Sequence, residues 1–366
     1  MQEIRIGIIG VGQIGKIHLD EYSAMQGVKL VAAADIDSQV LQRVGEKYGL
    51  EYTDTDFRNL VARDDIDAVD ICLHNNLHMP FTVAALQAGK HVFCEKPMAG
   101  SCADAVTMLK TARATGRHLS IQLGSLFEKE TKIAKRLIDA GHLGRTFHAR
   151  STGYRRRGRP FVDGYGTKSF VQKHIAAGGA LYDMGVYHIA RMLYLLGLPK
   201  IERISGKVYQ EIDMDTARRE SSGYDVEELG LGFVKFAGGA TLDIIESWAI
   251  HLGAFPGSSI VGSAGGICLS PFSFHASLSD VAMDATFDLK GTDWRWHQLD
   301  ATQAAYDSPQ SHWVAALRGD VVLLPTAEIA LATMLISEGI YLSDKLGREV
   351  TAEEVLEKST STAAKI

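Results

Sequence analysis

The chain has 366 residues, more than one hydrophobic core normally serves, so two domains are expected. Hydrophobic residues make up 46% of the chain and charged residues 22%, which is typical of a soluble globular protein. The formal net charge of −6 and the isoelectric point of about 6.1 argue against a protein that binds nucleic acid or an anionic membrane.

Cysteine and histidine spacing gives no sign of a disulfide framework or a metal site. The four cysteines lack CxxC spacing, so we expect them to be reduced and structural. The histidines show neither HxH nor HExxH spacing, and no metal is predicted. The chain starts directly with a strand pattern, and no stretch approaches eighteen uninterrupted apolar residues. We therefore expect a cytoplasmic protein with no membrane partner.

The first 120 residues alternate between strand and helix patterns. The expected strands are Ile4–Ile9, Val28–Ala34, Ala68–Leu73, His91–Glu95 and Leu119–Leu123. The expected helices are Ile14–Met25, Ser38–Tyr48, Asp56–Ala62, Met79–Ala88 and Ala103–Thr115. This alternation predicts an α/β fold in which helices cover both faces of a doubly wound parallel sheet.

A glycine-rich turn, Gly10-Val11-Gly12-Gln13-Ile14-Gly15, follows the first expected strand and opens the first expected helix. Alone, such glycines also mark ordinary strand-to-helix turns. Here Asp35 ends the second strand 35 − 15 = 20 residues after the last glycine, where an acid binds a ribose diol. We predict that Gly10, Gly12, Gln13 and Ile14 hold a pyrophosphate. Asp35 would favour NAD over NADP, because its charge repels a 2′-phosphate.

Lys96 lies where the apolar run His91-Val92-Phe93-Cys94-Glu95 ends at Pro97. Open α/β sheets bind ligands at the carboxyl ends of their strands, so Lys96 and His74, which follows the preceding strand, would border a nicotinamide. An oxidised nicotinamide would lower the pKa of Lys96 toward the range useful for proton transfer. The alternative is a surface lysine at a strand end.

The later chain predicts a second domain with long strands. We expect a helix over Glu130–Ala140, strands over Thr146–Tyr154, Ile201–Tyr209, Glu228–Phe236 and Ala240–Ser247, and helices over Gln310–Leu317 and Ala327–Asp344. The basic run Arg155-Arg156-Arg157-Gly158-Arg159 reads as a loop, and most of its arginines as solvated charge. We expect the tail from Lys358 to be mobile.

Gly10, Gly12 and Gly15, the triplet Glu95-Lys96-Pro97 and the segment from Gly178 to His188 resemble the Gfo/Idh/MocA oxidoreductases. The resemblance covers nearly the whole chain. It implies a Rossmann domain over residues 1–121 and, over residues 122–366, an α/β domain with a large open mixed, mainly antiparallel sheet. It also implies a cis Lys96–Pro97 peptide and a homodimer or homotetramer.

By the same resemblance, Lys96 and Asp183 would be catalytic and would contact substrate, together with Tyr187 or His188. Tyr187 is four residues after Asp183 and would share its helix face. His188 is five residues on, turned by roughly 100° from Tyr187. Family members carry histidine or tyrosine at the fourth place, so register favours Tyr187 and leaves His188 open.

The resemblance also places further residues around the ligands. Arg156 is the candidate from the basic loop for binding substrate. His78 and Glu95 are assigned to the cofactor side of the site together with His74, and His78 is expected near a helix start rather than as a proton donor.

Three functions are compatible with these residues. The first is an NAD-dependent oxidoreductase that transfers a hydride between the nicotinamide and a secondary alcohol or ketone of a sugar, inositol or sugar-derived polyol. The second is a glycoside hydrolase or lyase that uses bound NAD for transient oxidation and elimination. The third is a non-catalytic dinucleotide-sensing regulator, against which the retention of Lys96, Asp183 and Tyr187 argues.

Overall fold

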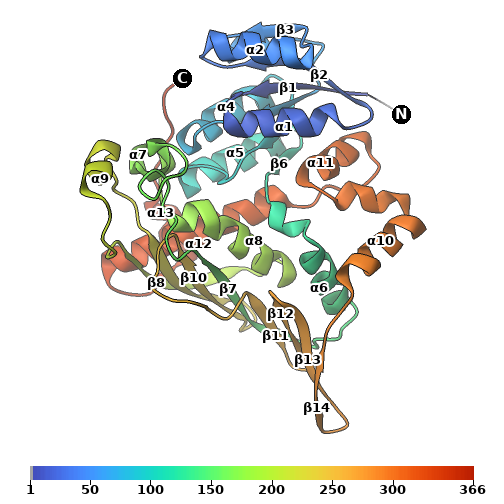
Figure 1. The fold of residues 1–366 in the computed structure, drawn as a ribbon, viewed down its shortest axis with the longest axis vertical. Helices are drawn as coiled ribbons and strands as arrows, with labels where there is room; N and C mark the ends of the chain where they lie inside the picture. Colours follow the sequence, from blue (N-terminus) through green and yellow to red (C-terminus); the bar gives the residue numbers. More distant parts are fainter. Residues whose placement is uncertain (1–2) are drawn as a thin grey trace. The chain divides into compact units, whose positions relative to one another are not determined.

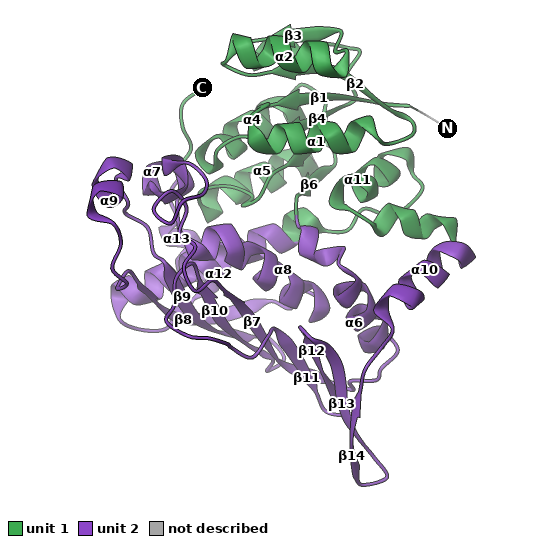
Figure 2. Cartoon of the chain, viewed as in Figure 1, with its two compact units in different colours: residues 1–122, 300–328, 362–366 green, residues 123–299, 329–361 purple. Residues whose placement is uncertain are grey.

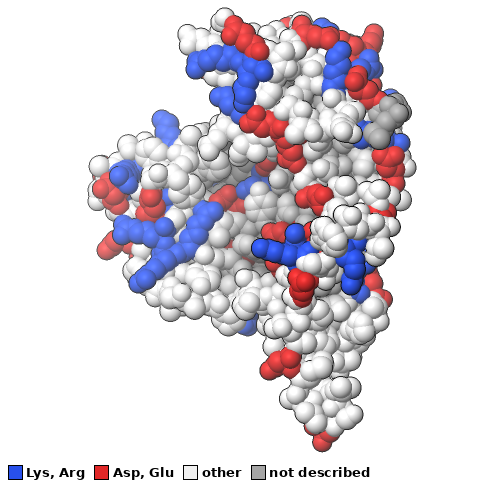
Figure 3. Space-filling view, turned by 45° about the vertical axis from the view of Figure 1, so that its right-hand side comes forward, with Lys and Arg blue, Asp and Glu red and all other residues white. Residues whose placement is uncertain are grey.

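The computed structural model describes residues 3–366 and divides the chain into two compact units (Figure 2). Unit 1 consists of residues 1–122, 300–328 and 362–366, and unit 2 of residues 123–299 and 329–361. Among the described residues, no helix is both long and apolar enough to span a membrane. Figure 3 shows acidic and basic side chains interspersed on the face that it presents.

Unit 1 is built on a six-stranded parallel sheet in the order β3-β2-β1-β4-β5-β6, which is the order of a dinucleotide-binding doubly wound sheet (Figure 1). The strands are β1 (Ile4–Ile9), β2 (Val28–Ala34), β3 (Tyr52–Asp54), β4 (Ala68–Ile71), β5 (His91–Cys94) and β6 (Leu119–Ile121). The helices between them are α1 (Gln13–Ser23), α2 (Ser38–Tyr48), α3 (Phe57–Val61), α4 (Asn75–Gln87) and α5 (Cys102–Thr115). The predicted doubly wound parallel sheet is therefore confirmed.

Alternation along β1 directs its side chains to two helical layers. Ile4 and Ile6 share a buried cluster with Tyr22 of α1 and Trp313 of α11 (Pro309–Arg318). Gly7 faces the other way, where a Cβ atom would lie 2.9 Å from Leu60 of α3. Helices therefore cover both faces, as the run of apolar residues in β1 requires.

The helix α11 belongs to unit 1, although the sequence boundary at residue 121 or 122 placed it in the second domain. The reason is packing: Trp313 is fully buried, and its ring lies 5.3 Å from that of Phe93 in β5, centroid to centroid. The Thr326 hydroxyl adds a polar contact, because it accepts a hydrogen bond of 3.0 Å from the backbone N–H of Ile121 in β6.

Unit 2 contains a nine-stranded sheet in the order β14-β13-β12-β11-β7-β10-β9-β8-β15. Its strands are β7 (Thr146–Tyr154), β8 (Ile201–Tyr209), β9 (Leu229–Phe236), β10 (Thr241–Ser247), β11 (Ser259–Gly262), β12 (Gly265–Leu269), β13 (Phe272–Leu278), β14 (Val281–Ala285) and β15 (Val350–Thr351). Only the β7–β10 pair is parallel among the strand pairs described for this sheet. The predicted mixed, mainly antiparallel sheet is confirmed.

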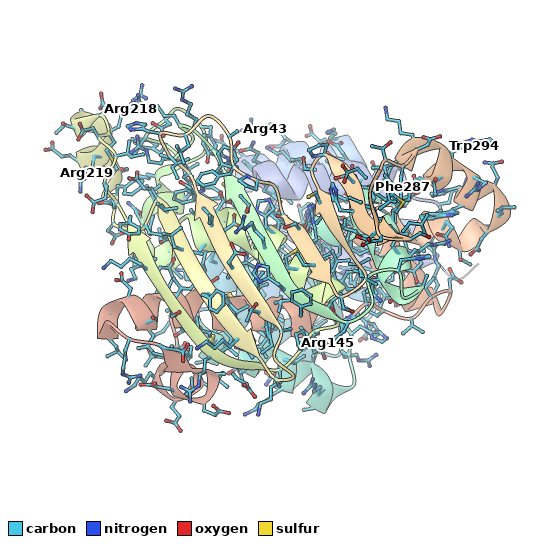
Figure 4. The ribbon with its side chains drawn as sticks, turned by 90° about the horizontal axis from the view of Figure 1, so that it is seen from below. Arg43, Arg145, Arg218, Arg219, Phe287 and Trp294 are labelled. Carbon is cyan, nitrogen blue, oxygen red and sulfur yellow. The ribbon has the colours of Figure 1, made fainter. Side chains whose placement is uncertain are left out.

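Helices pack against one face of this sheet. They are α6 (Lys129–Asp139), α8 (Val186–Leu195) and α12 (Thr326–Leu346). Glycines let α12 approach closely, because a Cβ atom at Gly206 or Gly232 would lie less than 3 Å from Ile340. Figure 4 shows the opposite face of the sheet with no helix across it; Arg218 and Arg219 mark α9 (Thr216–Ser222), and Trp294 marks α10 (Leu289–Leu299).

Two features differ from expectation. The strands β11 to β14 and the helix α10 follow short or irregular patterns that the sequence reading did not assign. The tail expected to be mobile is hydrogen-bonded at its end: the backbone N–H of Thr362 donates to the buried Asp104 carboxylate at 2.9 Å, and that of Ala364 donates to the Asn76 carbonyl at 2.9 Å. These bonds place residues 362–366 in unit 1.

Candidate functional site

The glycine turn between β1 and α1 has the shape of a dinucleotide cradle. Gly10 has a φ of +89°, and a Cβ atom there would lie 2.4 Å from the Cys72 carbonyl oxygen. A Cβ atom at Gly15 would lie 2.0 Å from the Gly10 carbonyl oxygen, whereas one at Gly12 would meet nothing within 4 Å. Gly10 and Gly15 are thus required by packing, and Gly12 leaves open space where a pyrophosphate would approach.

The amides at the start of α1 fit an anion. The helix begins at Gln13 with Gly12 as its N-cap, and among the described residues no side chain caps it. Its first backbone N–H groups therefore point at the open side of Gly12, as dinucleotide-binding helices require. Ile14 beside them is 41% exposed.

Asp35 lies at the end of β2, beside the same turn. One carboxylate oxygen accepts a hydrogen bond of 2.8 Å from the Val11 backbone N–H, and the other accepts one of 3.0 Å from Asp37. The exposed side chain that follows is apolar: Ile36 is 94% exposed. An acid fixed at this turn, with Ile36, Asp37 and Ser38 rather than an arginine directly after it, fits a ribose diol.

Lys96 follows β5 and is half-buried. The Lys96–Pro97 peptide is cis, as predicted. His74 is the N-cap residue of α4, and burial lowers its pKa. His78 is fully buried inside α4, with ring nitrogens 2.7 Å and 3.0 Å from the carbonyl oxygens of Pro97 and Leu73. His78 therefore ties the end of β4 to the loop after β5, and α4 begins four residues earlier than predicted.

Glu95 is held inside unit 1 rather than presented at its surface. It is 9% exposed, and its carboxylate lies 3.1 Å from His18 Nε2 and accepts a hydrogen bond of 3.0 Å from the Lys96 backbone N–H. The sequence reading did not single out His18, which lies on α1 three residues after the last glycine of the turn.

In unit 2, the segment from Gly178 begins with close packing. A Cβ atom at Gly179 would lie 1.9 Å from the Glu227 carbonyl oxygen. The buried Glu227 carboxylate accepts hydrogen bonds from the backbone N–H groups of Gly179 (2.8 Å) and Leu181 (3.0 Å). This carboxylate fixes the start of the segment that carries Asp183.

The backbone around Asp183 is a π-helix, Leu181–Gly185, and α8 begins after it. The sequence reading took Asp183 as the start of a regular α-helix, and that assumption is wrong. A π-turn closes its hydrogen bonds over five residues, so the four-residue rule that favoured Tyr187 does not hold across Asp183. Tyr187 is half-buried, and its carbonyl oxygen accepts a hydrogen bond of 2.6 Å from the Ser125 hydroxyl.

His188 is held by a carboxylate that the sequence reading missed. Its Nδ1 lies 2.9 Å from Oε2 of Glu246, which is fully buried on β10, and Ser151 of β7 donates to the other Glu246 oxygen at 2.9 Å. Burial alone would lower the pKa of His188, but the charge and hydrogen bond of Glu246 outweigh it and raise that pKa above the ordinary value. This arrangement orients a half-buried imidazole, a group that can accept and release a proton.

Asp183 attaches to the same strand. Its carboxylate accepts a hydrogen bond of 2.9 Å from Trp248 Nε1, and Trp248 follows Glu246 by two residues. Trp248 lies in the bend directly after β10, so Asp183 and His188 are both held at the same strand end. Arg155 of the basic loop lies close to the Asp183 carboxylate, with its guanidinium 3.9 Å away.

The remaining arginines of the basic loop have other roles. Arg156, the predicted substrate ligand, is exposed, and no side-chain hydrogen bond is described for it. Arg159 is fully buried and pairs with Asp163 and Glu228, each at 2.9 Å. The expectation of solvated charge is therefore wrong for Arg159, because two buried carboxylates offset its desolvation.

Sequence comparisons identify both halves of the chain. The profile of the oxidoreductase family with NAD-binding Rossmann fold matches residues 4–123, and that of the GFO/IDH/MocA C-terminal domain matches residues 131–268. D-glucoside 3-dehydrogenase of Escherichia coli (strain K12) is 30% identical over 255 residues, covering 68% of this chain and 71% of that protein. Myo-inositol 2-dehydrogenase of Thermotoga maritima is 29% identical over 222 residues, covering 58% of this chain and 63% of that protein.

Structural comparison agrees with the sequence match. The structure of levoglucosan dehydrogenase in complex with NADH and levoglucosan has a TM-score of 0.78 to this chain at 21% identity, covering 96% of this chain and 100% of that one. A likeness at this identity establishes the fold. Both family profiles and the 30% identical relative place the sequence more narrowly, and the chain belongs to the Gfo/Idh/MocA oxidoreductase family.

Proposed function

We propose that this protein is an NAD-dependent dehydrogenase or reductase that transfers a hydride between the nicotinamide and a secondary alcohol or ketone of a sugar, inositol or sugar-derived polyol. The observation that carries the proposal is the imidazole of His188, held at Nδ1 by the buried Glu246, on the strand end where Trp248 holds Asp183. Relatives named for glucosides and myo-inositol support this substrate class.

The cofactor proposed is NAD rather than NADP. Gly10, Gly12, Gln13 and Ile14 would hold its pyrophosphate, and Asp35 would accept hydrogen bonds from its ribose. Support comes from the open side of Gly12 and from the Asp35 carboxylate, which lies 2.8 Å from the Val11 amide. His74, His78, Glu95 and Lys96 belong to the strand ends that would border the nicotinamide. When bound, the nicotinamide supplies the hydride chemistry.

Oxidation of a secondary alcohol also releases the hydroxyl proton, and the chain must accept it. We assign this role to His188, because a carboxylate on Nδ1 fixes the tautomer and makes the ring a stronger base. Asp183 would bind a neighbouring hydroxyl and orient the substrate. Lys96 would bind the reacting oxygen or relay the proton, and Tyr187 is the alternative acid or base.

Binding of the substrate hydroxyls would also involve the basic loop. Arg155 is the stronger candidate because it approaches Asp183 at 3.9 Å, and Arg156 remains a candidate because it is exposed on the same loop. Arginine donates in a fork that suits paired oxygens. Substituting each by glutamine should raise KM more in Arg155→Gln than in Arg156→Gln.

A homodimer or homotetramer in the cytoplasm completes the proposal. The face of the nine-stranded sheet that no helix crosses (Figure 4) supports self-association. Phe233 follows Gly232, which faces α12, so its side chain points to the opposite face, and it is 38% exposed. Light scattering on the purified protein gives the subunit number directly, and a monomeric mass would contradict the proposed oligomer.

The experiment that tests the function is turnover on a panel. Purified protein is incubated with NAD or NADP and with glucosides, myo-inositol and levoglucosan, while NADH formation and sugar products are both measured. We expect NADH with at least one of these alcohols and faster turnover with NAD. Glycoside cleavage without net NADH would instead establish the NAD-assisted hydrolase or lyase, and dinucleotide binding without any product would establish the regulator.

Three variants then test the residues. Lys96→Ala should lower kcat while NAD still binds, and near wild-type turnover would remove Lys96 from the mechanism. Comparing His188→Ala with Tyr187→Phe decides between the two bases, because the larger loss of kcat should follow His188. If the larger loss follows Tyr187 instead, His188 has a structural role.

A further inference from the structure

A buried chain of polar groups connects three elements of unit 1. His18 of α1 lies between two carboxylates, with Nδ1 2.8 Å from Asp70 Oδ2 on β4 and Nε2 3.1 Å from Glu95 Oε1 after β5. The other oxygen of Glu95 accepts the hydrogen bond from the Lys96 backbone N–H at 3.0 Å. These hydrogen-bonded groups therefore connect Asp70 through His18 and Glu95 to the backbone of Lys96.

The imidazole of His18 carries a proton on each ring nitrogen. Both ring nitrogens face carboxylate oxygens, and only an imidazolium donates from both. His18 is 2% exposed and Asp70 is fully buried, so the pair is shielded from solvent. Burial opposes the charge on His18, but Asp70 outweighs it and raises the pKa of His18 far above the ordinary value. The same contact counteracts the burial of Glu95 and lowers its pKa.

Hydrogen bonding accounts for the cluster better than a metal ion does. Cys72 Sγ lies 3.3 Å from His18 Nδ1, and His18, Asp70 and Cys72 could together offer three ligand atoms. His18 Nδ1 instead contacts Asp70 Oδ2 directly at 2.8 Å, the distance of a charge-assisted hydrogen bond, and its other ring nitrogen faces Glu95.

We propose that His18 is a positioning residue, which acts through Glu95 to fix the backbone of Lys96 relative to α1. The inference rests on the proposed function, since α1 would hold the pyrophosphate at its N-terminus and Lys96 would act on the substrate. His18 belongs to the same helix as that N-terminus and lies six residues after Gly12. Its imidazole contacts the carboxylates of Asp70 and Glu95, which belong to other elements, at the same time. Without the imidazolium, two buried carboxylates would lose their shared partner, and Glu95 would no longer be held.

The first test needs no activity. In a long-range 1H–15N spectrum of the full-length protein, one histidine, assigned by its loss in His18→Gln, should keep both ring nitrogens protonated at about pH 9, where exposed histidines are neutral. In protein with 13C-methylated lysines, the titration of Lys96, assigned with Lys96→Ala, should move in both His18→Gln and Glu95→Gln, although the two variants remove charges of opposite sign. A neutral His18, or a Lys96 titration that His18→Gln leaves unmoved, overturns the proposal.

The second test is a double-mutant cycle in turnover. His18→Gln should lower kcat at least about tenfold with a change in the KM for NAD within about threefold. The double variant His18→Gln/Glu95→Gln should lose no more than Glu95→Gln alone, because the two residues act in series. Losses that multiply would contradict action through Glu95. Met108→Ala, a buried substitution in α5, controls for lowered stability and should keep kcat.

The two tests separate this inference from the proposed function. If the wild-type protein oxidises none of the panel, the proposed function fails, and the spectra still decide whether His18 is an imidazolium that controls Lys96. If the wild-type protein is active and His18→Gln keeps its kcat in the folded state, only the positioning role fails. A stoichiometric metal in elemental analysis, lost in His18→Gln, would replace the hydrogen-bonded chain by a metal site.

Discussion

Replacing Glu246 by glutamine should move the pH dependence of turnover. Glu246 is fully buried, and its contact of 2.9 Å with His188 Nδ1 is a charge-assisted hydrogen bond. Such bonds contribute about 1.5–3 kcal/mol. Losing this bond together with the negative charge of Glu246 lowers the pKa of His188. Burial remains in the variant and also favours the neutral ring.

The sign of the effect follows from the role of His188. A base in alcohol oxidation must be neutral, so turnover falls as the pH drops through the pKa of His188. In the wild-type protein, this acid limb of the pH–rate profile should lie above about pH 6.5. In Glu246→Gln the acid limb should move to lower pH. The assay is kcat/KM for NADH formation between about pH 5 and pH 10.

A matched variant controls for disturbance of the network. Ser151→Ala removes the other hydrogen bond of Glu246 but keeps its charge, so the limb should stay close to that of the wild-type protein. Thermal unfolding gives a second readout: because the folded pKa of His188 is raised, the pair stabilises fully below about pH 6.5 and loses this contribution as the pH rises through the folded value. An unmoved limb in Glu246→Gln would refute His188 as the base.

Three further substitutions test the cofactor site and the packing. Asp35→Ala should weaken NAD binding by about tenfold and raise the affinity for NADP relative to that for NAD. Titration with each dinucleotide measures both affinities, and an unchanged ratio of the two would contradict the proposed role of Asp35. Gly179→Ala should lower the free energy of unfolding by about 1–3 kcal/mol or more in urea, because its Cβ atom would lie 1.9 Å from a carbonyl oxygen, whereas Gly253→Ala, with nothing within 4 Å, should be near neutral. Trp313→Ala should cost about 3–5 kcal/mol, since the fully buried ring completes the core of unit 1; a loss below about 1 kcal/mol would show that this core does not depend on it.

Unit 1 was predictable because its signals are local. The strand Ile4–Ile9, the strand Val28–Ala34 and the helix Ser38–Tyr48 lie where the sequence pattern put them, and each is bounded by glycine or aspartate within a few residues. The glycine turn and Asp35 also come from one short stretch of chain. What this reading missed in unit 1 is β3, which has only three residues. It predicted α11 as a helix over Gln310–Leu317 but placed that helix in the second domain.

The candidate site of unit 2 depends on contacts that no local pattern contains. Glu246 lies 58 residues from His188 and 95 from Ser151 along the chain, and on a β-strand it reads as one polar residue among others. The π-helix over Leu181–Gly185 follows no spacing that the sequence displays, and it removes the regular helical register that favoured Tyr187. The contact between Glu246 and His188 is the tertiary observation on which we base the proposal of His188.

The two histidine–carboxylate groups of this chain differ in one respect that separates their roles. His18 has a carboxylate on each ring nitrogen, so both protons are held and the ring has none to exchange. His188 has a carboxylate on Nδ1 only, among the described residues, and its side chain is 26% exposed. A ring held on one side keeps its orientation and retains a nitrogen for proton transfer, as general acid–base catalysis requires. We therefore expect His18→Gln to lower the height of the pH–rate profile without moving its limbs, whereas Glu246→Gln should move the acid limb. A displaced limb in His18→Gln would mean that His18, too, exchanges a proton during turnover.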